Sequence, residues 1–356
     1  MRFEDVLEIK NGRNQKAVEN PGGQYPIYGS GGIMGYANDY LCDAQTVIIG
    51  RKGSINSPIF VEEPFWNVDT AFGLSANRDV LLPRYLYYFC KKFDFERLNK
   101  TVTIPSLTKS DLLKIEIDLP SLEKQQDVVD QLVKIERIIT LRKQELKFLD
   151  DLIKSRFVEM FGDPEINSMN LPVKPMTEAC EIIDGDRGKN YPTQEEFSDE
   201  GYCLFLNAKN VTSNGFSFEN CMFVTKEKDE ILRKGHLNRG DVVLTTRGTI
   251  GNLAFYDESV PHENVRINSG MVILRMNHEI VSEQFFIEQF KMQLGSIKEK
   301  IASGSAQPQL PISTMNKIVV LMPAVEQQQV FTDFVKQVDK SKLPVDFGIY
   351  IPTYAA

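Results

Sequence analysis

The sequence contains few of the side chains that most often bind metals or form cross-links. Its three histidines, His236, His262 and His278, include no pair at metal-ligand spacing. The five cysteines are scattered without a Cys-x-x-Cys pair, which favours structural thiols in a reducing compartment over disulfides or zinc. The sequence therefore predicts neither a disulfide framework nor a metal site.

Long apolar runs and common catalytic motifs are absent as well. No window approaches the roughly 20 apolar residues of a membrane span, and the first residues lack the apolar segment of a secretory signal. There is no Gly-rich phosphate loop, no His-Glu-x-x-His and no Gly-x-Ser-x-Gly. Acidic pairs such as Asp184 with Asp186 are common in turns, so we assign no catalytic residue.

What is present is the composition of a folded protein with an acidic total. The chain has 356 residues, 42% hydrophobic and 25% charged, with a formal net charge of −8. This length is enough for two ordinary domains. The acidic total weighs against a nucleic-acid partner without excluding one, because phosphate binding needs only a local basic surface.

The sequence repeats itself. Residues 105–126 align without a gap with residues 308–329, and nine of the 22 positions are identical. Upstream, "LEIKNG", "VIIGRKGSI" and "VDTAF" correspond to "CEIIDG", "VVLTTRGTI" and "INSGM" at offsets of 173, 195 and 199. The growing offset places about 30 extra residues in the second copy, mostly between Lys189 and Asp241. The sequence therefore predicts a tandem duplication with one framework and different loops.

Each copy mixes short strands with helices. β-Branched or apolar runs predict strands at 46–50, 114–120, 241–247 and 317–323. Amphipathic patterns predict helices at 83–100 and 282–300. This arrangement favours a compact, curved sheet in each copy rather than a doubly wound one.

Two longer helices follow the two copies. From Ser121, no proline or glycine interrupts the chain for about 40 residues until Gly162, which predicts a helix about 60 Å long. The second helix begins at residue 324, but Pro344 predicts its end near Leu343. Apolar residues at coiled-coil spacing predict an antiparallel helical pair. The predicted seam and subunit-interface residues are Val128, Leu132, Ile135, Ile139, Leu146, Leu149, Ile153, Phe331, Phe334 and Val338.

These observations predict an α+β protein with two tandem α/β heads separated by a helical pair. The predicted segments are a first head (1–120), a central long helix (121–162), a linker (163–171), a second head (172–323), a short second helix (324–343) and a non-helical tail (344–356).

Matched loops in the two heads contain polar side chains suited to DNA. "GRKGS" at 50–54 and "TTRGT" at 245–249 each place a cation, a glycine and a hydroxyl after a predicted strand. Arginine can pair with guanine, lysine can meet phosphate, and glycine lets the backbone approach closely. The predicted DNA-binding residues are Arg13, Lys16, Arg51, Lys52, Ser54, Lys100, Thr101, Thr103, Ser106, Lys109, Arg187, Lys189, Arg247, Thr249, Arg266, Ser303, Ser305, Gln307 and Gln309.

The head-to-helix junctions "LPSLEKQQDVV" and "MPAVEQQQ", the loop "QPQLP" and the helix exit "SRFVEMFGDP" form a recognisable set. Together they resemble the specificity subunit of type I restriction–modification enzymes, from about Phe3 to Lys342. The resemblance implies that the heads are target-recognition domains, each reading one half of a gapped, bipartite site in double-stranded DNA. The helices would then set the spacer between the two halves.

The resemblance also implies partners. These are two modification (methyltransferase) subunits and the restriction subunits, which would use S-adenosylmethionine, ATP and Mg. This chain would be non-catalytic and would supply recognition. It would be cytoplasmic in a bacterium or archaeon, without a membrane partner. Its short predicted second helix departs from the family pattern. Two other interpretations stay open on the residues alone. In the first, the chain is a helical-pair adaptor whose heads bind protein. In the second, it is a stand-alone DNA-modifying enzyme, and the missing catalytic motifs argue against this.

Overall fold

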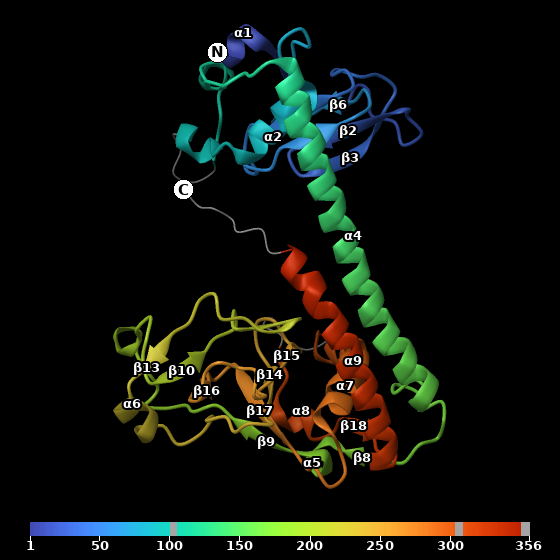
Figure 1. Ribbon diagram of the computed structural model, residues 1–356, viewed down its shortest axis with the longest axis vertical. Helices are drawn as coiled ribbons and strands as arrows, with labels where there is room; N and C mark the ends of the chain where they lie inside the picture. The colour runs from blue at the N-terminus through green and yellow to red at the C-terminus, as the bar shows by residue number, and fades with distance from the viewer. Residues whose placement is uncertain (100–104, 303–308, 350–356) are drawn as a thin grey trace. The chain divides into compact units, whose positions relative to one another are not determined.

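The computed structural model describes residues 1–99, 105–302 and 309–349, and it divides into two compact units. The first unit is Met1–Leu141 and the second is Arg142–Ala356. The boundary falls inside helix α4 (Leu122–Phe161), which is green in Figure 1. This helix confirms the prediction of a long central helix. No helix among the described residues is both long and apolar enough to cross a membrane.

An antiparallel sheet of order β1-β7-β4-β5 forms the centre of the first head. Its strands are β1 (Leu7–Asn11), β4 (Thr46–Gly50), β5 (Ile59–Val61) and β7 (Ala71–Ala76). Every residue of β4 is buried, because this β-branched strand pairs with a neighbour on each side. The core beneath the sheet includes residues of the two helices α1 (Phe3–Val6) and α2 (Pro83–Lys92).

Smaller elements complete the first head. They are a second sheet of β3 (Gly32–Ala37), β2 (Tyr25–Gly29) and β6 (Trp66–Asn67), a 3₁₀ turn η1 (Phe95–Leu98) and a short helix α3 (Lys109–Leu112). The helix predicted over 83–100 is thus split after Lys92.

The strand predicted at 114–120 is wrong. Only a single bridge forms there, between Arg2 and Glu116. Ile115 and Ile117 are buried against the core, so their alternation reflects burial rather than a strand. The available partner for this segment is the start of the chain, where the Ile117 N–H donates to the Met1 carbonyl at 2.8 Å.

The second head repeats the central sheet, with order β15-β14-β17-β9. Its strands are β9 (Cys180–Asp184), β14 (Val242–Thr245), β15 (Leu253–Phe255) and β17 (Met271–Met276). β9, β14, β15 and β17 take the places of β1, β4, β5 and β7, with the same antiparallel pairings. The structure therefore confirms the duplicated framework.

Other elements of the second unit support this sheet. They are β8 (Val173–Pro175), α5 (Met176–Ala179), α7 (Glu283–Ala302), α8 (Ile312–Met315) and β18 (Val319–Leu321). α7 and β18 confirm the helix predicted at 282–300 and the strand predicted within 317–323.

The segment between Lys189 and Asp241, which holds most of the extra residues of the second copy, forms several very short elements. These are η2 (Gln194–Glu196), β10 (Cys203–Leu206), β11 (Val211–Thr212), β12 (Gly215–Phe216), β13 (Phe223–Val224) and α6 (Lys226–Ile231). β10 lies between β13 and β16 (Val265–Ile267) in a three-stranded sheet. This sheet corresponds to β3-β2-β6 of the first head, because β16 comes directly before β17 in the chain, as β6 comes directly before β7.

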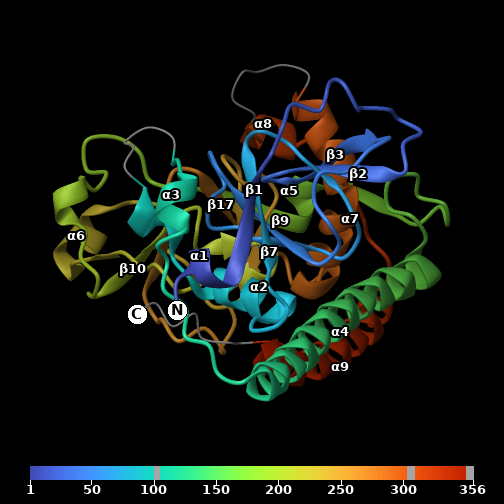
Figure 2. The ribbon, with the colours of Figure 1, turned by 90° about the horizontal axis from the view of Figure 1, so that it is seen from above.

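Helix α9 (Val325–Ile349) and the second half of α4 lie side by side and antiparallel (Figure 1, Figure 2). The Lys342 ammonium lies 2.8 Å from Asp150, and the Phe331 ring lies 5.4 Å from the Phe157 ring. The predicted end of this helix near Leu343 is wrong. A proline removes one helical N–H group and strains the turn before it, but it need not end a helix.

The predicted apolar seam is only partly correct. Ile153, Phe331 and Val338 are at most 6% exposed, and Leu132, Ile139, Leu146, Leu149 and Phe334 are half-buried. Val128 and Ile135, at 40% and 43% exposure, do not belong to the seam.

A contact within the first unit explains these two errors. The first half of α4 faces α2, where Tyr88 and Lys91 both reach Glu136, at 2.8 and 3.0 Å. Glu136 is half-buried, and so is the helix face that it shares with buried Val129. The prediction assumed a single partner along the whole helix, whereas α4 packs against α2 in its first half and against α9 in its second half.

Candidate nucleic-acid interface

The candidate loops of each head meet at one edge of its central sheet. β1 and β4 end at this edge and β7 begins there, because β7 is antiparallel to both. In the second head, β9 and β14 end where β17 begins. We call these the reading edges, formed by residues 11–16, 50–54, 67–70 and 105–109 in the first head and 184–189, 245–249, 267–270 and 309–310 in the second.

Equivalent residues join two loops at each reading edge. Lys52 forms a β-bridge with Ser106, and Arg247 forms one with Gln309. The repeat offsets of 195 and 203 make these two bridges equivalent. In both heads the next residue donates its N–H across the same pair of loops, at 3.0 and 2.9 Å. Two loops that sequence reasoning selected separately therefore form one surface.

Glycines at matching positions make this geometry possible. Gly53 and Gly248 have φ angles of +78° and +72°, which side chains with a Cβ rarely adopt. A Cβ at Gly12 or at Gly185 would lie 1.8 or 2.3 Å from a backbone oxygen of the neighbouring loop. The loop after β1 or β9 can therefore pack directly against the loop before β7 or β17.

Most predicted DNA-binding residues are exposed at these edges. Those placed there by the structure are Arg13, Lys16, Arg51, Lys52, Ser54, Lys109, Arg187, Lys189, Arg247, Thr249 and Gln309, with Ser106 half-buried. Lys100, Thr101, Thr103, Ser303, Ser305 and Gln307 lie outside the described residues.

The prediction that Arg266 binds DNA at the surface is wrong. Its side chain is 4% exposed, and its Nε donates to the Asp229 carboxylate at 2.6 Å. The equivalent residue of the first head, Asn67, is also buried, because both lie on the strand beside the central sheet. Arg266 therefore supports the second head from inside.

Acidic residues shape the reading edge of the second head. Arg187 donates to Asp184 at 3.1 Å, and Asp186 accepts backbone N–H groups from Arg187, Arg233 and Lys234. Desolvation by burial raises the pKa of Asp186, but these hydrogen bonds outweigh it, and the pKa lies below its ordinary value. The carboxylate thus fastens the loop after β9 to the segment at 233–234.

Sequence reasoning missed an exposed apolar hairpin in the first head. Ile33, Met34 and Tyr36 on β3 are 55%, 63% and 45% exposed. Its tip lies next to the "GRKGS" loop, because a Cβ at Gly50 would be 3.0 Å from the Ser30 Cβ. The prediction considered charged, amide and hydroxyl side chains and passed over apolar ones. The Gly-rich tip in "YGSGGIMGY" was the available signal.

A buried glutamine joins the first head to α4. Gln125 is 0% exposed, and its side-chain oxygen accepts the Leu82 N–H at 2.9 Å. Its side-chain nitrogen donates to the carbonyls of Val80 and Pro120, at 2.9 and 3.0 Å. These three hydrogen bonds hold the start of α4 against the loop before α2.

The second head has the same joint. Gln328 is 0% exposed, accepts the Ser282 N–H at 3.0 Å, and donates to the carbonyls of Ile280 and Pro323, each at 2.9 Å. The Pro and Gln identities that reveal the repeat thus have a structural role. They fix the direction in which each helix leaves its head.

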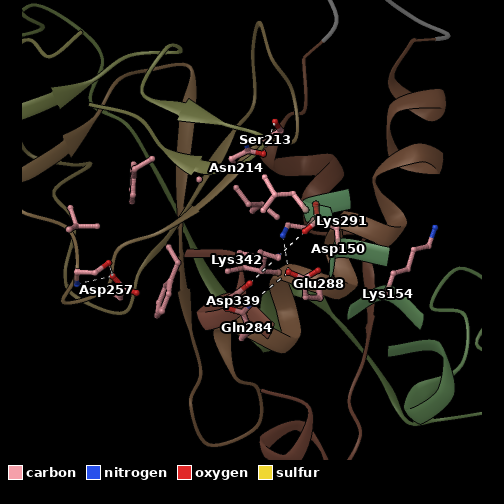
Figure 3. Close-up of a pocket in the computed structure, with 18 of the residues that line it drawn as sticks. Asp150, Lys154, Ser213, Asn214, Asp257, Gln284, Glu288, Lys291, Asp339 and Lys342 are labelled. Carbon is pink, nitrogen blue, oxygen red and sulfur yellow. Dashed lines mark hydrogen bonds and ion pairs between the residues drawn. The ribbon is translucent and has the colours of Figure 1, made fainter. Parts of the chain in front are cut away.

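A cavity of about 910 Å³ in the second unit is a weaker candidate for binding DNA (Figure 3). It lies among α4, α7, α9 and the β11–β12 hairpin, where Lys342 sits between Asp150 and Asp339. Carboxylates outnumber ammonium groups on its wall, which is lined by Asp150, Asp151, Asp257, Glu288 and Asp339 and by Lys154, Lys291 and Lys342. This excess of negative charge does not suit a phosphate backbone.

Comparisons with known proteins agree with the duplicated geometry. A family model described as the type I restriction modification DNA specificity domain matches residues 1–150 and 172–344. A putative type I specificity subunit of Mycoplasma pneumoniae is 26% identical over 171 residues, which span 43% of this chain and 56% of that relative.

Solved structures show the same fold at low identity. The S subunit of a type I restriction-modification system from M. genitalium has a TM-score of 0.59 and 18% identity, covering 98% of this chain and 91% of that one. A chain from a structure of a type I R-M system, concerned with complex assembly and conformational transition, has a TM-score of 0.52 and 15% identity, covering 97% and 90%.

Proposed function

Because the chain belongs to the family of type I restriction–modification DNA specificity domains, we propose that each head reads one half of a bipartite, gapped site in double-stranded DNA. One observation carries the proposal. The bridges Lys52–Ser106 and Arg247–Gln309 place an exposed cation beside a polar side chain at the same edge of both heads. A common backbone with different side chains is suited to two different half-sites.

Charge and chemistry at the edges support DNA as the ligand. In the first head, Arg13, Lys16, Arg51, Lys52 and Lys109 are exposed around one edge, although the whole chain carries a net charge of −8. Clustered cations attract phosphates and fix register, while arginine, glutamine and hydroxyl groups can read base edges. The side chains at matching positions differ between the heads, so the sequences that they read differ.

Helix α4 provides a surface for the modification subunits. Nine apolar side chains on it are exposed by 36% to 69%, more than a solvated helix needs. They are Leu122, Val128, Val133, Ile135, Ile138, Leu141, Phe148, Leu152 and Val158. The modification and restriction subunits bring S-adenosylmethionine, ATP and Mg, and this chain contributes recognition without a reaction of its own.

The test is to co-express the chain with candidate modification subunits and to map N6-methyladenine across the host genome. We expect a gapped, two-part motif. Exchange of residues 1–120 should change one half of that motif, and exchange of residues 172–323 should change the other. A motif that changes as a whole under either exchange would contradict two independent readers.

Single substitutions sharpen the test. Lys52→Ala should weaken binding to one half-site and Arg247→Ala to the other, each by about 1–3 kcal/mol if a base contact is lost. Lys174→Ala is the matched control. Lys174 is also a cation of the second head, half-buried and paired with Glu178 at 2.9 Å, but it lies near the start of β9, at the opposite end of the sheet.

Salt dependence separates this function from that of a protein-binding adaptor. The assembled complex should lose about 10³-fold or more in DNA affinity between 50 and 200 mM salt if it neutralises six or more phosphates. A complex that forms but shows no DNA binding at 50 mM salt would return the adaptor interpretation to first place.

A further inference from the structure

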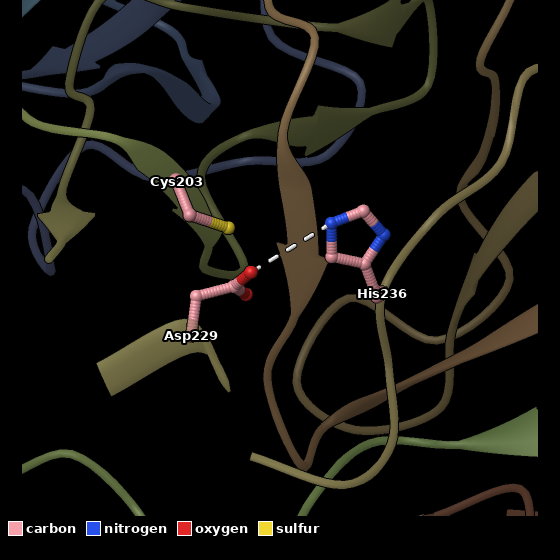
Figure 4. Close-up of side chains that lie close together, drawn as sticks. All are labelled: Cys203, Asp229 and His236. Atoms are coloured by element: carbon pink, nitrogen blue, oxygen red, sulfur yellow. Dashed lines mark ion pairs between the residues drawn. The ribbon is translucent and has the colours of Figure 1, made fainter. Parts of the chain in front are cut away.

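Three side chains that suit zinc converge in the second head. They are Cys203 on β10, Asp229 on α6 and His236 in the segment after α6, and their donor atoms all lie within 4.8 Å of one another. Figure 4 shows the sulfur, a carboxylate oxygen and a ring nitrogen facing a common point. We propose that these residues bind one Zn²⁺ ion, which stabilises the region of β10 and α6 in the second head.

The histidine is oriented as a ligand. Its Nδ1 lies 3.1 Å from the Leu237 carbonyl oxygen, and the tautomer that donates to this oxygen presents its Nε2 lone pair to Asp229. Nε2 and the Asp229 Oδ2 are 3.9 Å apart, and in this tautomer both can act as metal ligands. Ligand atoms around tetrahedral zinc are about 3.3–3.7 Å apart, given bond lengths of roughly 2.0–2.3 Å. A small inward shift therefore completes the geometry.

Arg266 holds the carboxylate in place. Its Nε donates to Oδ1 of Asp229 at 2.6 Å, and its Nη2 donates to the Asp229 backbone carbonyl at 2.9 Å. The other carboxylate oxygen, Oδ2, is left facing His236. Hydrogen bonding of this kind to a ligating carboxylate is usual around metal sites, where it fixes the ligand's orientation. In this proposal, the buried arginine orients a metal ligand.

The cysteine completes the set. Cys203 is 0% exposed, and desolvation raises the pKa of its thiol to about 12, with the Asp229 charge adding to the effect and the Arg266 charge opposing it. Such a thiol is unreactive towards ordinary reagents, whereas zinc displaces its proton and binds the thiolate. His236 is partly exposed, so the fourth position is open to water.

The three ligands lie among very short elements. All three fall between Lys189 and Asp241, whose elements are two to six residues long. One face of β10 packs into a cluster of four buried residues, Cys203, Phe205, Val224 and Leu232, while Leu204 and Leu206 join a larger core. A metal bound to β10, α6 and the segment after α6 would link these short elements and add to their stability.

Zinc at this place would also steady the reading edge. The residues just before His236, Arg233 and Lys234, donate their backbone N–H groups to Asp186. A metal that fixes His236 to β10 and α6 therefore restrains the loop that carries Arg187.

The experiment uses the full chain purified from zinc-supplemented cells. Mass spectrometry should find one zinc ion per chain, and substitution with Co²⁺ should give the near-ultraviolet band of a thiolate–cobalt bond. His236→Gln should weaken Co²⁺ binding by at least about 100-fold, and Cys203→Ser should abolish the thiolate band. His278→Gln and Cys221→Ser are matched controls outside the cluster and should bind as wild type.

A chelator provides the second readout. It should lower the thermal midpoint of the wild type and of both controls, and leave that of His236→Gln unchanged. Because His236 is 38% exposed at its side chain, this variant is expected to fold, as circular dichroism can verify. Folded wild-type protein without bound zinc and without a thiolate–cobalt band would overturn the proposal, and so would equal cobalt affinity in His236→Gln. Neither result depends on DNA binding.

Discussion

The buried glutamine joints lead to a prediction that separates structure from recognition. Replacing Gln125 by methionine keeps the length and approximate volume of the side chain but removes its amide. The three hydrogen bonds to Leu82, Val80 and Pro120 are lost together. We therefore expect the first head to lose stability while its reading edge keeps its exposed side chains.

The size of the effect follows from the number of bonds and from burial. Each hydrogen bond contributes about 1 kcal/mol net, and a partner left without water costs about 1–3 kcal/mol. The three backbone partners are half-buried, so water can reach them in part and the lower end applies. We expect a loss of about 3 kcal/mol. With a urea slope of about 2 kcal/mol per molar, the unfolding midpoint should fall by roughly 1.5 M.

The assay exploits the single tryptophan of the chain. Trp66 lies in the first unit, is 8% exposed, and donates its indole N–H to the Arg13 carbonyl at 3.0 Å. Its fluorescence therefore reports the unfolding of the first head. Hydrogen exchange gives a local readout, since the Leu82 amide should lose protection in the variant.

The neighbouring residue provides the control. Gln126 is exposed and donates to Asp130 at 2.7 Å, so Gln126→Met should cost no more than about 0.5 kcal/mol. The same change at Gln328 should leave the Trp66 midpoint close to that of the wild type, because that joint belongs to the second unit. If Gln125→Met and Gln126→Met shift the midpoint equally, the joint does not hold the head as described.

Further predictions concern packing, backbone and thiols. Phe331→Ala should cost about 3–5 kcal/mol of second-unit stability, measured by thermal unfolding, because the ring is fully buried among three others. Gly248→Ala should destabilise the "TTRGT" loop by about 1–2 kcal/mol and weaken only one half-site, since φ there is +72°. Gly295 lies in helix α7 with open space around it, so Gly295→Ala should instead increase the free energy of unfolding by about 0.5–1 kcal/mol and raise the thermal midpoint. At pH 8, a thiol reagent should label half-exposed Cys221 first and leave Cys42 unlabelled, since burial raises the pKa of that thiol to about 12.

The framework was predictable because the two copies of the repeat carry the same residue types at equivalent positions. Gln125 and Gln328, or Gly53 and Gly248, coincide at constant offsets, and each pair has one structural role. Strands such as β4 and β14 were predictable because buried β-branched runs leave few alternatives. The long helix was predictable from the absence of proline and glycine.

The orientation of side chains was harder to predict, because it depends on partners that are distant in sequence. Val128 and Ile135 fit the apolar period, but contacts of α2 with Glu136 turn a different face of α4 inward. Arg266 reads as a surface cation until its strand is seen beside β10. Cys203 and His236 are 33 residues apart in the sequence, and they meet because the chain between them folds back on itself.

Each buried glutamine takes all of its hydrogen-bond partners from its own copy of the repeat. Neither joint therefore depends on which loops the other copy carries. A recombination event that replaced one head at the repeated Pro-to-Gln junction would transplant a complete joint together with a new reading edge. We expect genes with this architecture to diversify by exchanging whole heads, since no compensating substitution is needed elsewhere in the chain.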